Sequence, residues 1–203
     1  MLALAAVSAL AALLTPLDAP PVINVPVYSL ATLNADGSTN MNILTYATPA
    51  GVTPRLWAVS LYRPTRSHAN FLARGTGVLQ LLCEPHTALA HTLGGQSGAD
   101  ADKAAACAAA GLAWEEPPRD ETWTGDEQLL PGCASYIRLV QVGDLVPCGE
   151  HDLALCRVEA VLGQADGPTP ADATSTAAMR AAGRITARGR AIAPDAPEFG
   201  QPQ

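Results

Sequence analysis

Strand-like runs dominate this sequence, and the segments between them do not follow a regular strand–helix alternation. Runs of this kind cover residues 27–34, 39–48, 55–61, 78–83, 133–142 and 152–162. Residues 35–38 read Ala-Asp-Gly-Ser, which is turn chemistry, so the first two runs should form a hairpin. Stretches compatible with helices, 68–74, 86–93, 100–110 and 174–182, are inserted irregularly. This pattern predicts a mainly β fold with helical insertions: an antiparallel barrel with a helical cap rather than a doubly wound parallel sheet.

The segment SLYRPTRSHANFL, residues 60–72, joins one of these strands to a short helix. The free amides at a helix start and the helix dipole favour an anion there. Arg66 offers a planar fork of donors, Thr65 and Ser67 each add a hydroxyl, and Arg63 is close enough to share the anion. The segment therefore predicts a phosphate site. The alternative is a solvated loop in which Ser67 simply caps the helix.

Neutral polar side chains alternate with apolar ones along NMNILTYAT, residues 40–48. Amides and hydroxyls such as those of Asn42 and Thr45 suit a planar heterocycle that carries carbonyl and ring N–H groups. A half-exposed strand without a ligand is the alternative. Further along, His151 lies between Glu150 and Asp152 at the mouth of a strand. A histidine beside carboxylates can hold or pass a proton near neutral pH, although an ordinary turn histidine is the alternative.

Charge and composition exclude several classes of protein. The net charge is −7 and the pI about 4.9, so nucleic acid and anionic lipid are poor partners. Neither GxGxxG nor GxxxxGK[ST] occurs. Five cysteines without a CxxC spacing argue against a disulfide framework and a structural zinc site, and indicate small buried residues in a reducing compartment. The remaining histidines suggest no metal set, so no metal is expected.

Three regions are expected along the 203 residues. Residues 1–20 are predicted to be an apolar N-terminal helix, packed on the domain or on a dimer partner, or else a targeting remnant; a membrane anchor is the least favoured option. Residues 21–163 should form the barrel domain, and residues 164–203 a C-terminal helix with a loose tail. The expected compartment is the cytoplasm, for a soluble protein, with a plastid stroma as the alternative.

Several of these segments, in this order, resemble the flavin reductase-like, FMN-binding split-barrel family. VYSLATLNADGSTNMNILTYAT resembles the opening hairpin of that family, and RSHANFL resembles its phosphate-binding stretch. GVLQLLCEP resembles the next core strand, and SGADADK a short stretch of the type SGRDxDK, with Ala99 replacing arginine. LPGCASYI and GEHDLALCRVEAV resemble the closing strands, and MRAAGRITARGR a C-terminal helix and turn of some members.

The resemblance implies an FMN-binding split β-barrel, antiparallel and Greek-key-like, that forms a homodimer. It implies an oxidoreductase that transfers a hydride from NADH or NADPH to flavin. The flavin carries the chemistry, and the protein supplies position and electrostatics. His151 is the implied catalytic residue, as a nicotinamide contact or proton relay. The implied cofactor-binding residues are Asn42, Ile43, Leu44, Thr45, Ser60, Leu61, Tyr62, Arg63, Thr65, Arg66 and Ser67.

Three other functions remain open at the level of sequence. The first alternative is a flavin-binding electron-transfer protein without a nicotinamide site. A split barrel that has lost flavin and serves as a binding or structural dimer is a second possibility. A haem- or other tetrapyrrole-binding relative is a third.

Overall fold

A computed structural model describes residues 15, 17–18, 21–119 and 121–194 of the chain. The expected N-terminal helix and the end of the expected tail lie largely outside these residues. Within the described part, no helix has the length and apolar character needed to cross a membrane.

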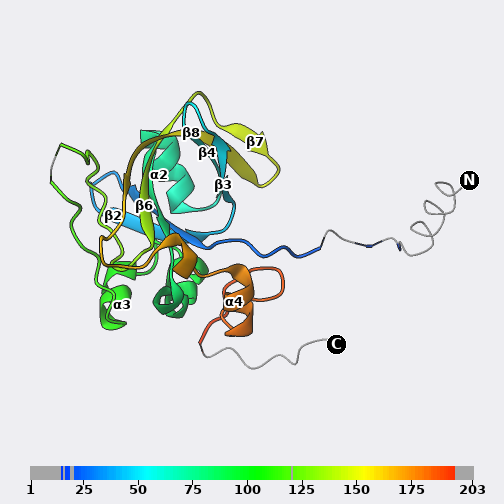
Figure 1. Cartoon of the computed structure of the whole chain (residues 1–203). Coiled ribbons are helices and arrows are strands. Elements are labelled where there is room, and N and C mark those ends of the chain that lie inside the picture. Colours follow the sequence, from blue (N-terminus) through cyan, green and yellow to red (C-terminus); the bar gives the residue numbers. More distant parts are fainter. Residues whose placement is uncertain (1–14, 16, 19–20, 120, 195–203) are drawn as a thin grey trace, which may run out of the picture.

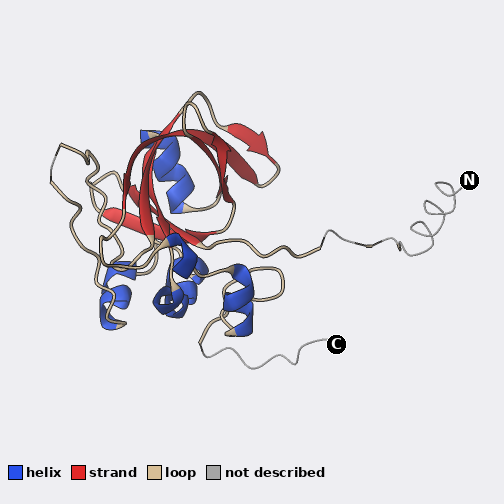
Figure 2. Ribbon diagram, viewed as in Figure 1, coloured by secondary structure: helices blue, strands red, loops and turns tan. Residues whose placement is uncertain are grey.

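The strands form one antiparallel sheet that curls into a barrel (Figures 1 and 2). Its order is β2-β1-β5-β6-β8-β4-β3, and the short β7 pairs with β8. The strand bounds are β1 Tyr28–Leu33, β2 Thr39–Leu44, β3 Ala47–Gly51, β4 Leu56–Tyr62, β5 Thr76–Leu81, β6 Ser135–Gln141, β7 Val146–Cys148 and β8 His151–Leu162. The expected mainly β fold with helical insertions is thus confirmed.

The opening hairpin forms as expected, but its second strand ends at Leu44, before the end of the expected run 39–48. β1 pairs with β2 around the predicted turn, where Asp36 accepts hydrogen bonds from the backbone N–H and the hydroxyl of Ser38. The single strand expected over 39–48 is wrong, because the chain leaves β1 after Leu44 and pairs again as β3 with β4. Pro49, which lies beyond the expected run 39–48, belongs to β3, an edge strand with a register shift between Pro49 and Gly51.

Helix α2, Arg66–Arg74, follows β4 and lies within the ring of strands in Figure 2. Its N-cap is Thr65, whose backbone is extended and whose side-chain Oγ1 accepts a hydrogen bond from the backbone N–H of His68 at 3.2 Å. It ends at Gly75, whose φ of 66° is a left-handed conformation that glycine adopts without strain. Phe71 of α2 is fully buried among barrel side chains such as Leu30, Leu79 and Leu139. This packing fixes the start of α2 relative to the sheet.

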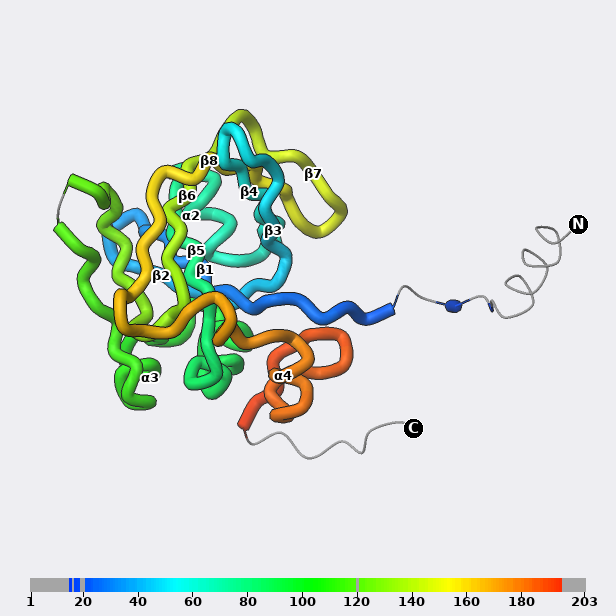
Figure 3. Tube along the Cα trace, in the orientation of Figure 1, coloured from blue at the N-terminus to red at the C-terminus, as the bar shows by residue number. Residues whose placement is uncertain are grey.

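The remaining helices cover the other face of the strands. They are the 3₁₀ helix η1 Glu84–Leu89, the π-helix η2 Ala90–Gly95, α3 Lys103–Ala109, the 3₁₀ turn η3 Pro170–Asp172 and α4 Thr176–Ala181. Figure 3 shows α3 and α4 below the barrel, while much of the chain that leads to β6 runs along the left side of the barrel. Their apolar side chains form a second core with β1 and β5, in which Leu93, Leu130 and Met179 are fully buried. The two cores together hold η2 and the start of α3 against β2.

The cysteines are free, and four of the five are buried, as their apolar interpretation predicts. Cys148 differs, because it lies exposed in the turn between β7 and β8. The expected strand from residue 152 begins one residue earlier, at His151, and pairs with both β7 and β4 there.

Candidate functional site

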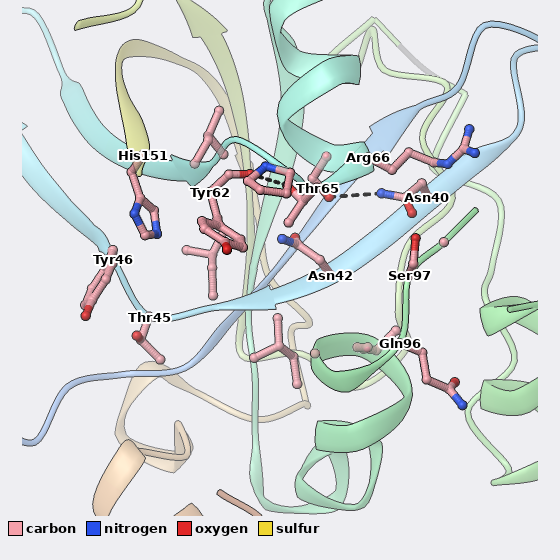
Figure 4. A pocket seen from close by; sticks show the side chains of 18 of the residues that line it. Asn40, Asn42, Thr45, Tyr46, Tyr62, Thr65, Arg66, Gln96, Ser97 and His151 are labelled. Carbon is pink, nitrogen blue, oxygen red and sulfur yellow. Dashed lines mark hydrogen bonds between the residues drawn. The ribbon is translucent and has the colours of Figure 1, made fainter. Parts of the chain in front are cut away.

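A cavity of about 410 Å³ opens between β2, the β4–α2 junction, the loop after η2 and the start of β8 (Figure 4). Pockets of this size are common for small-molecule and cofactor sites. The cavity draws on segments that are far apart in the sequence, from Asn40 in β2 to Gly189 near the C-terminal end of the described chain. Its lining is mainly neutral and polar at one end and aromatic at the other.

Eleven of the twelve residues predicted from the sequence line this cavity. They are Asn42, Ile43, Leu44, Thr45, Ser60, Leu61, Tyr62, Thr65, Arg66, Ser67 and His151. The twelfth, Arg63, lies outside the lining and donates hydrogen bonds from Nε and Nη2 to Asp152 at 3.0 and 2.8 Å. The structure therefore gathers three separate sequence segments around one space and assigns Arg63 to a neighbouring ion pair.

The end of the cavity where the sequence predicts a phosphate, here called the anion end, is formed by Thr65, Arg66 and Ser67 at the start of α2, with Asn40 of β2 beside them. The first N–H groups of a helix, here those of Arg66 and Ser67, have no partner within the helix. Arg66 is exposed. Because Thr65 and not Ser67 caps the helix, the expected capping role of Ser67 is wrong. Ser67 is instead 1% exposed and accepts a hydrogen bond from Asn40 Nδ2 at 2.9 Å, shown as a dashed line in Figure 4.

The loop after η2 closes this end from the other side. Gln96, Ser97 and Gly98 belong to the lining. A Cβ atom at Gly98 would collide with the side-chain oxygen of Asn40, so any other residue there would force this amide to shift. The loop thus rests directly on the amide that holds Ser67.

Lys103, the first residue of α3, also lines the cavity and is only 6% exposed. Its Nζ donates to the backbone oxygens of Met41 and Leu93, both at 3.0 Å. Burial lowers the pKa of this ammonium to about 8, because desolvation disfavours the charged form. A buried cation with carbonyl partners alone is therefore part of the anion end.

Asn42 occupies the middle of the cavity and points into it in Figure 4. Its Oδ1 is buried and has no hydrogen-bond partner among the described residues. A buried polar atom without a partner is costly in a folded chain. This amide is therefore available for a ligand that carries complementary donors or acceptors.

The aromatic end consists of Tyr46, Tyr62 and His151, which Figure 4 shows facing one another across the cavity mouth. The His151 ring lies 5.8 Å from that of Tyr46 and 5.2 Å from that of Tyr62. The two tyrosines are 65% and 44% exposed. Since their rings lie at the surface, they can contact a planar ligand or a second molecule.

Asp152 lies beside the cavity and links the start of β8 to the β4–α2 junction and to α2. Its Oδ1 accepts from Arg63, and its Oδ2 lies 2.7 Å from Nε2 of the buried His68 in α2. These two partners, with Arg63 first, hold the pKa of the Asp152 carboxyl below its ordinary value. Because Asp152 follows His151 directly, the same carboxylate fixes the start of β8 against the helix that presents the anion end.

Sequence reasoning did not list several lining residues: Asn40, Tyr46, Pro64, Leu93, Gly94, Gln96, Ser97, Gly98, Lys103, Arg188 and Gly189. A signal existed for Ser97, Gly98 and Lys103, which lie in the stretch SGADADK. Arg188 and Gly189 lie in the quoted C-terminal stretch MRAAGRITARGR. Asn40, Tyr46 and Pro64 lie in the stretches at residues 40–48 and 60–72 that supplied the predicted residues. For Leu93, Gly94 and Gln96, the position next to the cavity depends on packing between distant segments. Among the described residues, no group of three or more His, Cys, Asp or Glu could hold a metal ion.

Comparison with known proteins gives a family match and a set of similar folds. A family model described as a flavin reductase like domain matches residues 22–178. No curated protein matches the sequence significantly.

Solved structures share the fold at low sequence identity. An FMN-binding protein from Thermus thermophilus, solved with bound p-hydroxybenzaldehyde, is 20% identical with a TM-score of 0.59, over 74% of this chain and 79% of that chain. Flavoredoxin from Methanosarcina acetivorans is 14% identical with a TM-score of 0.64, over 80% and 84%. The NADH:FAD oxidoreductase of Streptomyces globisporus is 13% identical with a TM-score of 0.58, over 70% and 77%. These likenesses confirm the expected split-barrel fold.

Proposed function

Because this chain belongs to the flavin reductase-like domain family, we propose that it binds FMN and transfers a hydride to it from NADH or NADPH. The observation that carries the proposal is the single cavity that joins a helix start able to bind an anion to a strand edge of neutral polar groups. An oxidoreductase of this class needs both features in one site, since the cofactor has a phosphate at one end and a planar ring system at the other.

The residues present fit such a cofactor. The unpartnered Oδ1 of Asn42 and the hydroxyl of Thr45 suit the polar edge of a ring system with N–H and carbonyl groups. At the other end, the N–H groups of Arg66 and Ser67 and the guanidinium of Arg66 suit a phosphate. Gly98 permits close approach of the loop that covers this end.

Each group of residues has a distinct task in the proposed reaction. Thr65, Arg66 and Ser67 bind the phosphate and so fix the cofactor along the cavity. Asn42 to Thr45 orient the ring edge, and Ser60 to Tyr62 line one side. When bound, the flavin supplies the hydride acceptor. His151 contacts the nicotinamide or relays a proton at the open end. No formal base is required, because hydride transfer itself moves no proton to the protein.

We expect the protein to act as a homodimer. The exposed Tyr46 at the mouth of the cavity, together with Val52 just beyond β3, supports an association of two copies near the site. Light scattering of the purified protein tests this part of the proposal, which fails if the mass is that of one chain.

The absorption spectrum of the purified protein tests the function. Protein reconstituted with FMN should show bound-flavin absorption, and NADH or NADPH added without oxygen should bleach it. Protein that binds no flavin would overturn the proposal, and a sharp violet band would indicate haem in its place.

A flavin-binding electron-transfer protein without a nicotinamide site is the second candidate. It is supported by the fold likeness to flavoredoxins, including that of Methanosarcina acetivorans. The same experiment separates the two functions. Bound flavin that is bleached by dithionite, but by neither nicotinamide, would favour the second candidate.

A further inference from the structure

Positive charge is concentrated near the end of the described chain. Four of the twelve Lys and Arg residues, Arg180, Arg184, Arg188 and Arg190, lie within eleven positions, and no Asp or Glu occurs between residues 173 and 194. Among the described residues, none of these four guanidinium groups forms an ion pair. The last three are exposed. On a chain with a net charge of −7, such a segment is a local surface that attracts anions.

These last three arginines belong to a small hairpin, residues 184–192, here called the cationic hairpin. Two backbone hydrogen bonds pair its arms, and the N–H of Gly189 closes the turn by donating to the backbone oxygen of Thr186 at 2.9 Å. Ile185 is 7% exposed and anchors the hairpin in the second core. Figure 3 shows the hairpin as the orange-red segment beside α4. Because the turn is bonded and anchored, the position of Arg188 at its tip is fixed by the fold.

The tip of the cationic hairpin reaches the cavity of the candidate site, which Arg188 and Gly189 help to line. One arm also packs on the wall of this cavity: a Cβ atom at Gly94 of η2 would lie 3.7 Å from that of Ala191 and 3.6 Å from that of Ile43. The hairpin therefore meets β2 within the stretch that is proposed to orient the ring. Its cations come from a different wall than Arg66 at the start of α2.

The arrangement of these charges suits a second anionic ligand. The phosphate of FMN is already assigned to the start of α2, so the hairpin cations remain for another molecule in the same cavity. They begin at Arg188 and continue outward on both arms to Arg184 and Arg190, over about 13 Å of extended chain. A nicotinamide dinucleotide that brings its ring to the cavity carries its phosphate groups away from that ring. A phosphate monoester matches the donor forks of exposed guanidinium groups.

We propose that the cationic hairpin binds the 2′-phosphate of NADPH, with Arg188 as the specificity-determining residue that makes this protein select NADPH over NADH. The inference rests on the proposed function, because it names the second substrate of the same site. NADH and NADPH have the same reacting ring and the same pyrophosphate, and NADPH adds one phosphate monoester. The hairpin acts on this difference and takes no part in hydride transfer.

A purely structural role of the hairpin makes a different prediction. If its arginines only kept an exposed turn hydrated, their loss would leave both nicotinamides unaffected. If the hairpin only supported the cavity wall at Ile43, its disturbance would weaken both nicotinamides, and FMN, together. The ratio of the half-saturating concentrations of NADH and NADPH therefore reports on recognition of the 2′-phosphate.

The experiment follows the bleaching of flavin in the FMN-loaded full chain by stopped flow without oxygen, at a series of NADPH or NADH concentrations and constant ionic strength. The variants are Arg188→Gln, Arg188→Glu and the double variant Arg184→Gln with Arg190→Gln. Arg157→Gln is the matched control, because it removes an exposed cation of β8 outside the cavity.

The wild-type protein and the control should be half-saturated at a concentration of NADPH about tenfold lower than that of NADH. Arg188→Gln should raise the value for NADPH about tenfold and that for NADH less than about twofold, and Arg188→Glu should raise the value for NADPH further, because it places a negative charge beside the phosphate. The double variant should lie between wild type and Arg188→Gln. Equal values for the two nicotinamides in the wild-type protein, or a preference for NADPH that survives Arg188→Glu, would overturn the inference and leave the proposed function intact.

Binding of adenosine 2′,5′-bisphosphate gives a readout that needs no reaction. Isothermal titration compares it with 5′-AMP, which lacks the 2′-phosphate. The bisphosphate should bind the wild-type protein and Arg157→Gln about tenfold more tightly than 5′-AMP does, and this difference should vanish in Arg188→Gln. Equal binding of the two nucleotides to the wild-type protein would contradict the proposal. If neither nicotinamide bleached the flavin, the proposed function would fail, and this titration would still decide the role of the hairpin.

Discussion

The two ends of the cavity are built in opposite ways. At the anion end the side chains are mostly buried and already held by the protein: Ser67 by Asn40, and Lys103 by two backbone oxygens. At the aromatic end, Tyr46 and Tyr62 are exposed, and their rings pack beside that of His151.

This difference in burial indicates which end of the cavity should bind the cofactor and which should control its reduction. Groups that are fixed before a ligand arrives bind it with little loss of conformational freedom, so the anion end should set the affinity for the cofactor. Exposed rings can admit and release a second ligand such as the nicotinamide, so the aromatic end should set the rate of flavin reduction. Changes at the first end should therefore act on Kd, and changes at the second on turnover.

The largest effect is expected from Asp152, because it holds α2, which starts at the anion end, against β8, which starts at the aromatic end. Asp152→Ala leaves the buried His68 and Arg63 without their shared carboxylate. The Tm should fall, the Kd for FMN should rise about tenfold, and reduction by NAD(P)H should slow as well. Thermal unfolding, flavin titration and stopped-flow absorbance measure the three. Asp144→Ala, in an exposed loop, is the control. If Asp152→Ala changed only the Kd for FMN or only the rate of reduction, the coupling of the two ends through Asp152 would be contradicted.

Arg66→Ala should act on affinity alone. It removes a charge-assisted contact to the phosphate, which costs about 1–3 kcal/mol of FMN binding and leaves riboflavin binding unchanged. Isothermal titration measures both ligands. Arg74→Ala, at the other end of the same helix, removes an equal charge outside the cavity and is the control. Unchanged FMN affinity would remove Arg66 from the site.

Lys103 should also make the stability of the ligand-free protein depend on pH. Its pKa is lowered to about 8 in the folded chain, from 10.5 in the reference state, so the folded protein binds fewer protons than the unfolded chain between these values. The free energy of unfolding should therefore rise with pH in this window relative to Lys103→Met, by about 1–2 kcal/mol. Denaturant titrations at pH 7, 8, 9 and 10 (chosen to span roughly that window) measure the difference, and a flat difference would contradict it.

His151→Ala should have the smallest effect on binding. The Kd for FMN should change by less than about twofold, because the ring lies at the exposed end and holds no anion. Reduction of bound flavin should slow, since a contact to the nicotinamide is lost. Stopped-flow bleaching decides the matter: weaker FMN binding with an unchanged rate would reverse the assignment of the two ends.

Local chemistry explains which parts of this structure the sequence predicts. The turn at Asp36 and Gly37 and the glycine at the end of α2 depend on neighbouring residues only, and both lie where the pattern places them. The break after Leu44 could not be read in this way, because it arises when the chain exchanges β1 for β4 as its partner. The three-residue β7 is too short for any alternation to be visible.

The residues of the candidate site also differ in whether a short sequence segment is enough to predict them. The junction at Arg66 and the strand at Asn42 were found because each carries its polar residues in one short segment. Lys103 was missed as a candidate, because a lysine at a helix start normally reads as a surface residue. Its burial is decided by Met41 and Leu93, which reach it from β2 and η2.

The edge of the sheet at β3 has a consequence for contacts between molecules. An unpaired strand edge usually offers a row of amide donors on which another chain can grow a continuous sheet. Pro49 has no amide hydrogen, and the register shift that follows it bends the ladder before Gly51. A continuous sheet between two copies along β3 is therefore interrupted at its middle residue.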